Sequence, residues 1–244
     1  MKQQLKLILG HRGYPPRATE NTLTSARLAL EAGADGLEFD VQKAKDAYIV
    51  FHDHTLERLS GRPDKVADVD AAVWRHLPVE IPELKDWLRA LPRTILLNLE
   101  LKEETLAPGD ATALDAIVRA HYDPENVLIS SFEHTLLPPW RELGYRTALL
   151  FDQRHIAPGA PSVQALIRRY RPWSVNVPVL YFQNVSRARA TLTAFVVRQV
   201  YGVKVLVWTV NTEAEMELVW PYCDGLITNE TERAVAFRRR QEPE

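Results

Sequence analysis

Two acidic residues, Glu38 and Asp40, lie two positions apart in the apolar segment GLEFDV. Side chains two residues apart on a β-strand point to the same side, so we expect the two carboxylates to lie next to each other. Buried carboxylates raise each other's pKa unless a positive charge lies close by. A hard divalent cation, which prefers oxygen ligands, would supply that charge. Taken alone, the pair fits equally well an edge strand that carries two surface acids.

A third acidic residue, Glu100, lies in the segment TILLNLELK, where Asn98, Glu100 and Lys102 alternate with leucines. One side of this predicted strand is therefore polar and the other aliphatic. Polar groups inside a barrel need a partner or a function, because an unpaired buried charge is costly. The alternation predicts that Glu100 joins Glu38 and Asp40 as a metal ligand. An internal salt bridge between Glu100 and Lys102 is the alternative.

Two histidines, His11 and His52, directly follow predicted strands in the segments ILGHRG and YIVFH. Imidazole changes charge near physiological pH, so a pair of histidines can act as base and acid. Arg12 and Lys102 bring positive charge to the same end, and both side chains suit phosphate recognition. Together with the three acids, these residues predict a metal-dependent site for an anionic ester. Trp208, in VLVWTVN, is expected either to line the pocket or to pack in the barrel.

Eight short apolar runs alternate with longer amphipathic segments along the chain, and their composition suits buried strands. The runs span residues 5–9, 36–41, 95–101, 127–130, 147–151, 173–177, 203–208 and 225–227. Helices are predicted at 22–31, 110–120, 162–170, 186–200, 212–220 and 230–239. This alternation predicts one (β/α)8 TIM-barrel domain over residues 1–244, with a doubly wound open sheet as the competing architecture. Barrel active sites lie at the carboxyl ends of the strands, where the three acids and His11 are expected.

One segment interrupts the alternation. Residues 48–51 form a further extended run, and residues 52–77 are polar, with turn signals at Gly61 and Pro63. This stretch is predicted to be a short excursion after the second strand that buries no core of its own.

The overall composition narrows the class of protein. The 244 residues include 30 Lys plus Arg and 32 Asp plus Glu, a near balance that gives no reason to expect nucleic acid or an acidic membrane as partner. The single cysteine, Cys223, cannot form an intrachain disulfide, which fits a reducing compartment. Apolar runs are too short for a signal peptide or a membrane span. We therefore expect a cytoplasmic protein without stable membrane insertion, and the oligomeric state stays open.

Several segments, taken in order, resemble the glycerophosphodiester phosphodiesterase family. They are HRGYPPRATENT, GADGLEFDV, IVFHDHTLERLSG, IPELKDWL, LNLELK, the pair Ser131-Phe132, VWTVN and DGLITN. The resemblance covers nearly the whole chain. It implies a (β/α)8 barrel that hydrolyses glycerophosphodiesters to glycerol 3-phosphate and an alcohol. The partner of such an enzyme is a small-molecule substrate.

The resemblance also implies roles for particular residues. The three acids would bind one divalent metal ion, usually Mg²⁺ or Ca²⁺, and the two histidines would be the general acid and base. Arg12 and Lys102 would contact phosphate. The Glu20-Asn21-Thr22 match is expected to shape the first loop and cap the first helix. The implied mechanism uses the neighbouring glycerol hydroxyl as nucleophile and passes through a cyclic phosphate.

Two segments depart from the family pattern. Ala44-Lys45-Asp46-Ala47 replaces Thr-Lys-Asp-Gly, and Thr228-Asn229-Glu230-Thr231 replaces Thr-Asp-x-Pro, which leaves the form of the last loop open. Two other functions remain as alternatives. The same site could hydrolyse lysophospholipids in the manner of a lysophospholipase D, or the barrel could bind a phosphate ligand without catalysis.

Overall fold

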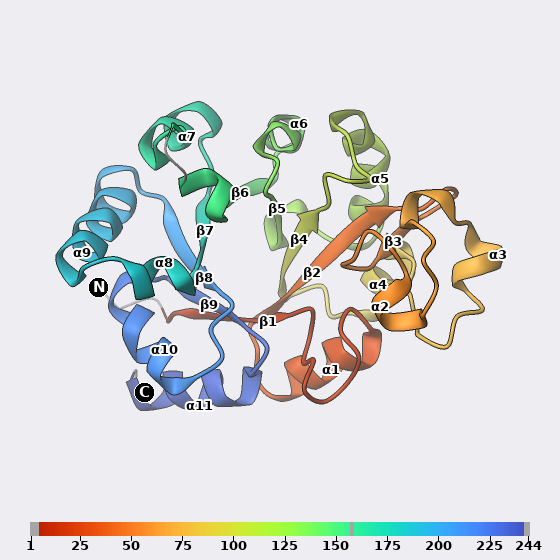
Figure 1. Ribbon diagram of the computed structural model, residues 1–244, viewed down its shortest axis with the longest axis horizontal. Coiled ribbons are helices and arrows are strands. Elements are labelled where there is room, and N and C mark those ends of the chain that lie inside the picture. The colour runs from red at the N-terminus through yellow and green to blue at the C-terminus, as the bar shows by residue number, and fades with distance from the viewer. Residues whose placement is uncertain (1–4, 157–158, 242–244) are drawn as a thin grey trace.

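The computed structural model describes residues 5–156 and 159–241, which form a closed barrel of eight parallel strands (Figure 1). The strands are β1 (Leu7–His11), β2 (Gly36–Lys43), β4 (Leu96–Leu101), β5 (Val127–Ser131), β6 (Arg146–Leu150), β7 (Ser174–Pro178), β8 (Lys204–Trp208) and β9 (Gly225–Thr228). β1 pairs with both β9 and β2, which closes the barrel and excludes the doubly wound open sheet. The eight predicted runs are confirmed as strands.

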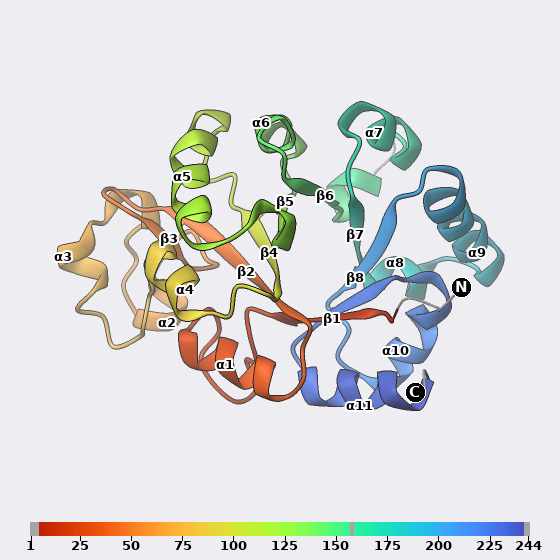
Figure 2. The same cartoon turned by 180° about the vertical axis from the view of Figure 1, so that it is seen from behind.

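Helices surround the barrel when it is seen from either side (Figures 1 and 2). They are α1 (Leu23–Glu31), α2 (Glu57–Ser60), α3 (Ala71–Trp74), α4 (Leu84–Ala90), α5 (Ala111–His121), α6 (Pro138–Glu142), α7 (Val163–Tyr170), α8 (Val179–Asn184), α9 (Arg187–Phe195), α10 (Glu213–Val219) and α11 (Thr231–Gln241). The six predicted helices are confirmed, although a π-helix (Val196–Val200) continues α9. The short helices α2, α3, α4, α6 and α8 were not predicted, because two turns or fewer give a weak periodicity. In the described part of the chain, no helix has the length and apolarity needed to cross a bilayer.

The hydrophobic core has two layers, and this division orients the polar residues. Inside the barrel, a small cluster contains Leu9, Leu128, Ala148, Leu206 and Ile227. A larger core between the strands and the helices contains the alternate residues of β2, namely Leu37, Phe39 and Val41. Burial of a side chain of this size contributes roughly 1.5–3 kcal/mol. The outward anchoring of these residues turns the intervening Glu38 and Asp40 into the barrel.

The excursion after β2 contains β3 (Tyr48–Val50), which pairs antiparallel with β2, followed by α2 and α3 at one side of the barrel (Figure 1). The extended run predicted at 48–51 is thereby confirmed. The expectation that this segment buries no core is wrong, because a separate buried cluster forms under it. Its members are Ala44, Ile49, Phe51, Leu56, Val66, Val69, Trp74 and Ile81. These residues show no regular spacing along the chain, so only the folded segment brings them together.

Candidate functional site

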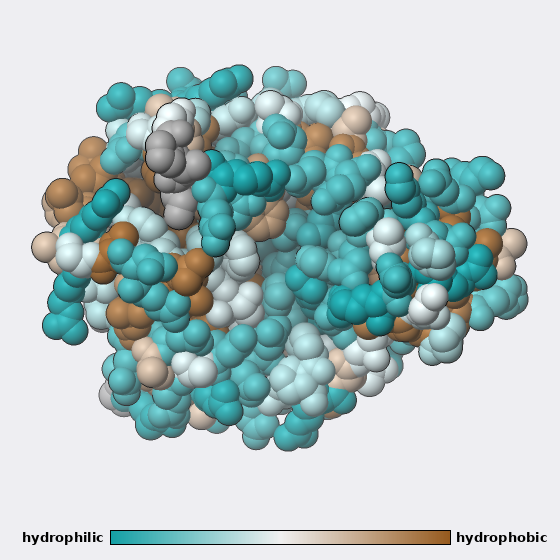
Figure 3. Space-filling model, viewed as in Figure 1, coloured by the Kyte–Doolittle hydropathy of each residue, from teal (hydrophilic) through white to brown (hydrophobic). Residues whose placement is uncertain are grey.

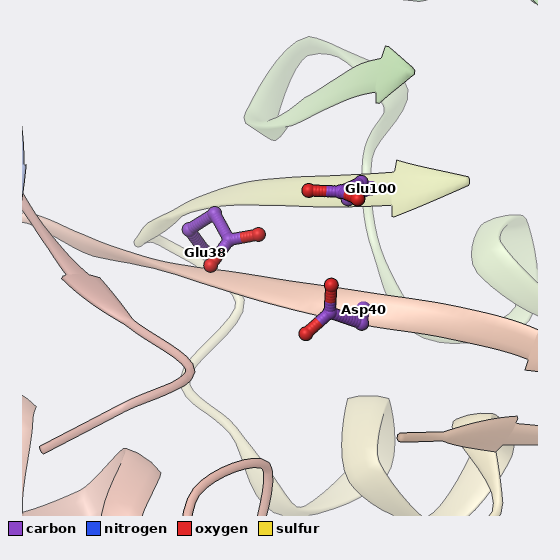
Figure 4. Close-up of side chains that lie close together, drawn as sticks. All are labelled: Glu38, Asp40 and Glu100. Carbon is purple, nitrogen blue, oxygen red and sulfur yellow. The ribbon is translucent and has the colours of Figure 1, made fainter. Parts of the chain in front are cut away.

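Three carboxylates from two neighbouring strands lie together inside the barrel: Glu38 and Asp40 on β2, and Glu100 on β4 (Figure 4). The parallel register of β2 and β4 places Asp40 opposite Glu100. One oxygen of each residue lies within 4.8 Å of the others. Their side chains are buried, with 3, 1 and 8% of the residue surface exposed. The structure thus brings together the three acids that the sequence singled out.

Two cations lie against these carboxylates. Lys102 Nζ is 2.6 Å from Glu100 Oε1 and 2.9 Å from Asp40 Oδ1. Arg12 Nε is 3.3 Å from Asp40 Oδ2, and the Arg12 backbone N–H donates to Glu38 Oε2 at 3.2 Å. The Glu100–Lys102 ion pair considered as an alternative is therefore present. It does not balance the cluster, because three acids face two cations.

The electrostatic environment differs among the three acids. Burial, together with Asp40 and Glu100 nearby, raises the pKa of Glu38 well above its usual range. Burial likewise raises the pKa of Glu100 to about 7, although Lys102 opposes this. Burial acts on Asp40 too, but Lys102 and Arg12 hold the pKa of that carboxyl well below its usual range. The cluster therefore gathers more negative charge than its own cations stabilise, and a bound cation would relieve the excess.

Buried polar groups next to the acids also fit a bound ion. Asn98 is opposite Glu38 across β2 and β4, and Ser130 is opposite Glu100 across β4 and β5. Both residues are fully buried. The Asn98 amide and the Ser130 hydroxyl have no hydrogen-bond partner among the described residues. Groups of this kind usually bind water or a ligand, and an all-oxygen donor set suits Mg²⁺ or Ca²⁺.

His11 ends β1 and lies beside Glu38, with its Nε2 3.8 Å from Glu38 Oε2. Its Nδ1 is 2.7 Å from Oδ1 of Asn229, in the loop after β9. An amide oxygen can only accept, so Nδ1 carries the hydrogen and Nε2 of the neutral imidazole is free to take a proton. Burial, and secondly Arg12, lower the pKa of His11 to about 4. This histidine is therefore held in its neutral form.

His52 follows β3 and has a charged partner. Its Nδ1 is 2.6 Å from Asp53 Oδ1, and Arg58 binds the other Asp53 oxygen. Arg58 also pairs with Glu20, which in turn accepts from Arg12 at 3.0 Å. Burial lowers the pKa of His52 from its ordinary value, while the carboxylates of Asp40 and, to a smaller extent, Asp53 oppose this shift. A continuous chain of ion pairs thus links His52 to the arginine beside the acids.

The loop after β1 takes a strained backbone form at two residues of the site. Arg12 has a φ of 54° and Asn21 a φ of 59°, both in the left-handed region that few non-glycine residues adopt. Asn21 Nδ2 donates to Asp40 Oδ2 at 2.8 Å. Thr22 caps α1 by accepting from the backbone of Ser25, as predicted. The loop therefore does more than cap the helix, because it delivers Asn21 to a buried carboxylate.

A cavity of about 570 Å³ opens beside the acids, and the surface is hollowed there among hydrophilic residues (Figure 3). Its lining comprises His52, Asp53, His54, Thr55, Glu57, Arg58, Glu100, Lys102, Glu103, Glu104, Phe132, Asp152 and Arg154. Trp208 does not line this cavity. Its ring packs edge-on against Phe132, with 5.6 Å between centroids, and its Nε1 donates to Asn176 O at 3.2 Å. Phe132 therefore forms the aromatic part of the wall.

Sequence reasoning missed the residues that hold the two histidines, Asn229 and Asp53. Asp53 directly follows His52, and this adjacency was a usable signal. Asn229 lies in the departure from the family pattern at the last loop, and only the folded barrel shows that it reaches His11.

Comparisons with known proteins agree with this geometry. A family model described as the glycerophosphoryl diester phosphodiesterase family matches residues 11–233. A glycerophosphodiester phosphodiesterase of Caldanaerobacter subterraneus is 26% identical, over 96% of this chain and 98% of the relative.

Solved structures of similar fold include a glycerophosphodiester phosphodiesterase from Thermotoga maritima, which is 29% identical in sequence and has a TM-score of 0.81. The match covers 96% of this chain and 99% of the Thermotoga maritima chain. A phosphodiesterase from Oleispira antarctica, solved with the product sn-glycerol-3-phosphate, has a TM-score of 0.79. It covers 96% of both chains, and at 23% identity this likeness shows the fold alone.

Proposed function

Because the chain belongs to the glycerophosphoryl diester phosphodiesterase family, we propose that it hydrolyses glycerophosphodiesters to glycerol 3-phosphate and an alcohol. The observation that carries this proposal is the buried cluster of Glu38, Asp40 and Glu100, with His11 and His52 beside it. The product bound by the Oleispira antarctica relative is the one proposed here. We propose further that residues 1–244 act as one barrel domain.

One divalent ion, Mg²⁺ or Ca²⁺, is proposed to bind the three acids, and when bound it supplies positive charge that stabilises the phosphoryl oxygens during reaction. Arg12 and Lys102 lie against the same acids and would add positive charge around a bound phosphate. Lys102 also lines the cavity, where the substrate would enter. Trp208 would act on the substrate indirectly, by supporting Phe132.

The partners of the two histidines suggest how protons would move. Asn229 offers His11 a neutral acceptor, so His11 suits the role of base and would take the proton of the glycerol hydroxyl next to the phosphate. That hydroxyl oxygen then attacks phosphorus, and the bond from phosphorus to the alcohol oxygen breaks. Asp53 favours the protonated form of His52, which would give its proton to the leaving alcohol. Water then opens the cyclic phosphate with the two roles exchanged.

The composition of the cavity wall favours water-soluble substrates over lysophospholipids. Phe132 is the one apolar side chain among the lining residues. A lysophospholipid would need an apolar wall for its acyl chain, whereas charged groups suit a small polar diester.

The direct test measures glycerol 3-phosphate released from glycerophosphocholine and glycerophosphoethanolamine with Mg²⁺, with Ca²⁺ and with a chelator. We expect release that the chelator abolishes, and faster turnover than with micellar lysophosphatidylcholine. Binding of glycerol 3-phosphate without hydrolysis of any diester under either metal would instead show a non-catalytic barrel.

The neutral partner of His11 leads to a prediction about pH. Asn229→Asp should raise the pKa of His11 by about one unit or more, because a carboxylate stabilises the imidazolium. A base must be unprotonated, so the acidic limb of the kcat/KM profile, set by a His11 pKa of about 4, should move to higher pH and activity near pH 5 should fall. Asn126→Asp, at the opposite end of the barrel before β5, should leave the profile unchanged. An unshifted acidic limb in the Asn229→Asp protein would contradict the role of His11 as base.

A further inference from the structure

Acidic residues are absent from residues 153–212, a stretch that runs from the end of β6 to the start of α10. It carries eight basic residues, namely Arg154, Arg168, Arg169, Arg171, Arg187, Arg189, Arg198 and Lys204. The rest of the chain keeps 22 basic residues against all 32 acidic ones. The near balance of charge over the whole chain therefore hides a strongly positive sector of the barrel.

Much of this charge is exposed and has no acidic partner. Arg154 and Arg198 form ion pairs with acids outside the stretch. Five exposed arginines form no ion pair with a carboxylate of the described residues: Arg168, Arg169 and Arg171 at the end of α7, and Arg187 and Arg189 at the start of α9. Arg168 and Arg169 lie over the rings of Tyr201 and Tyr170, contacts that leave their charge without a carboxylate partner. Exposed arginines without an acidic partner are available to an anionic partner.

The two arginines at the start of α9 do not stabilise this helix through its dipole. Arg187 and Arg189 lie in its first turn, which holds no acidic residue. The amino end of a helix carries partial positive charge, so cations are unfavourable at that end. Their position therefore calls for an explanation outside the helix itself.

Apolar side chains lie on the same sector. On α9, Ala190 and Ala194 are buried, whereas Leu192 and Phe195 lie on the opposite face with 64 and 58% of their surface exposed. Leu180 of α8 is 44% exposed. Hydrophobic residues gather over α8 and α9 at the left of Figure 3. An apolar patch beside unpaired cations is typical of an interaction surface.

We propose that this docking face, made of the exposed side chains of α8 and α9 with the arginines at the end of α7, binds the anionic phospholipid surface of a membrane. Leucine and phenylalanine side chains would enter the boundary between headgroups and acyl chains, while the arginines contact anionic headgroups. Nucleic acid would satisfy the arginines but leave Leu192 and Phe195 in water. Such docking is peripheral and reversible, in agreement with the absence of a membrane-spanning helix from the described residues.

The test measures partition of the whole protein onto sedimented vesicles of phosphatidylcholine alone or mixed with phosphatidylglycerol. Binding is expected only to the mixed vesicles and should weaken as salt is added. Each cation near an anionic surface contributes roughly fivefold, so Arg187→Gln with Arg189→Gln should reduce partition by about tenfold or more. Leu192→Asn with Phe195→Asn should also reduce partition by about tenfold, because the polar side chains bury no apolar surface.

Matched controls keep the charge and polarity changes but move them elsewhere. Arg89→Gln with Arg93→Gln removes two exposed arginines outside the docking face, and Leu218→Asn changes an exposed leucine of α10. These proteins should bind the mixed vesicles as the unchanged protein does. All variants should keep their thermal unfolding temperature and their hydrolysis of soluble diesters, which shows that the substitutions act on docking alone.

Several results would overturn the proposal. They are failure to bind mixed vesicles, equal binding to neutral vesicles, or an equal loss in the control variants. Competition by duplex DNA that persists in the Leu192→Asn and Phe195→Asn protein would assign the arginines to nucleic acid. A dimer that these two substitutions dissociate would assign the face to a second copy of the chain. Vesicle binding, competition by DNA and the oligomeric state do not depend on catalysis, so these results are independent of the proposed hydrolase function.

Discussion

Glu38→Gln should lower kcat/KM on glycerophosphodiesters by about a hundredfold or more and raise the melting temperature of the metal-free protein. The loss of activity follows if Glu38 is a ligand of the ion that stabilises the phosphoryl oxygens, since single stabilising groups of this kind contribute roughly 10²–10³-fold. The gain in stability follows because the Glu38 carboxylate is buried and is repelled by the negative charges of Asp40 and Glu100. Activity and stability are therefore expected to change in opposite directions.

The sign of the stability change comes from the raised pKa of Glu38. The folded state holds a proton on this carboxyl at a pH where the unfolded chain has released it, so stability falls as pH rises from the unfolded pKa to the folded one. At neutral pH and above, the ionised form costs stability, and a neutral glutamine removes that cost. Mg²⁺ or Ca²⁺ should raise the melting temperature of the unchanged protein, and this shift should be smaller in the variant.

A buried glutamate outside the cluster provides the matched control. Glu83 pairs with Arg75 and Lys85, and although burial opposes the shift, these cations lower the pKa of Glu83. Its carboxylate therefore adds stability above the unfolded pKa, so Glu83→Gln should lower the melting temperature. Activity and the metal-induced shift should stay unchanged. If Glu38→Gln kept the full metal response, or if it behaved like Glu83→Gln, Glu38 would not be a metal ligand.

Strand periodicity accounts for the part of the site that could be predicted. Residues at alternate positions of β2 and β4 face one side, and the apolar residues between them anchor the other side in the outer core. Because β2 and β4 are parallel neighbours, their carboxyl ends lie side by side, and the register places Asp40 opposite Glu100. No loop conformation enters this reasoning, so the acids and the closed barrel could be expected from the sequence.

Loop residues could not be placed in the same way. Arg12 and Asn21 reach Asp40 because the first loop takes a left-handed backbone at both, a local conformation that spacing does not encode. Asn229 meets His11 because β1 and β9 are neighbours in the closed barrel, although they lie at opposite ends of the chain. Contacts of this kind depend on closure and backbone detail together.

Two further features of the fold and the surface could not be predicted from the total composition. The core under the excursion contains Phe51, Val66 and Trp74, which are separated by polar residues and show no period. The positive sector at 153–212 disappears when charges are summed over the whole chain. Both features depend on where residues of one kind lie along the chain.

His11→Ala and His52→Ala should each lower kcat for glycerophosphocholine by about a hundredfold or more, the usual size of a general acid or base contribution. His54→Ala is the matched control, because His54 lines the same cavity but its side chain forms no hydrogen bond or ion pair among the described residues; only its backbone carbonyl accepts, from the N–H of Val66. That protein should hydrolyse at close to the unchanged rate. Unchanged rates in both the His11 and His52 proteins would disprove the assignment of proton transfer to these two residues.

The nature of the leaving group separates the two roles. In a substrate whose alcohol is replaced by p-nitrophenol, the departing oxygen is stable as an anion and needs no proton. The His52→Ala protein should then recover most of its lost rate, because the missing acid is no longer required. The His11→Ala protein should stay slow, since the attacking hydroxyl must still lose its proton. Recovery in the His11 protein alone would reverse the two roles, and with them the interpretation of Asn229 as the partner that keeps the base neutral.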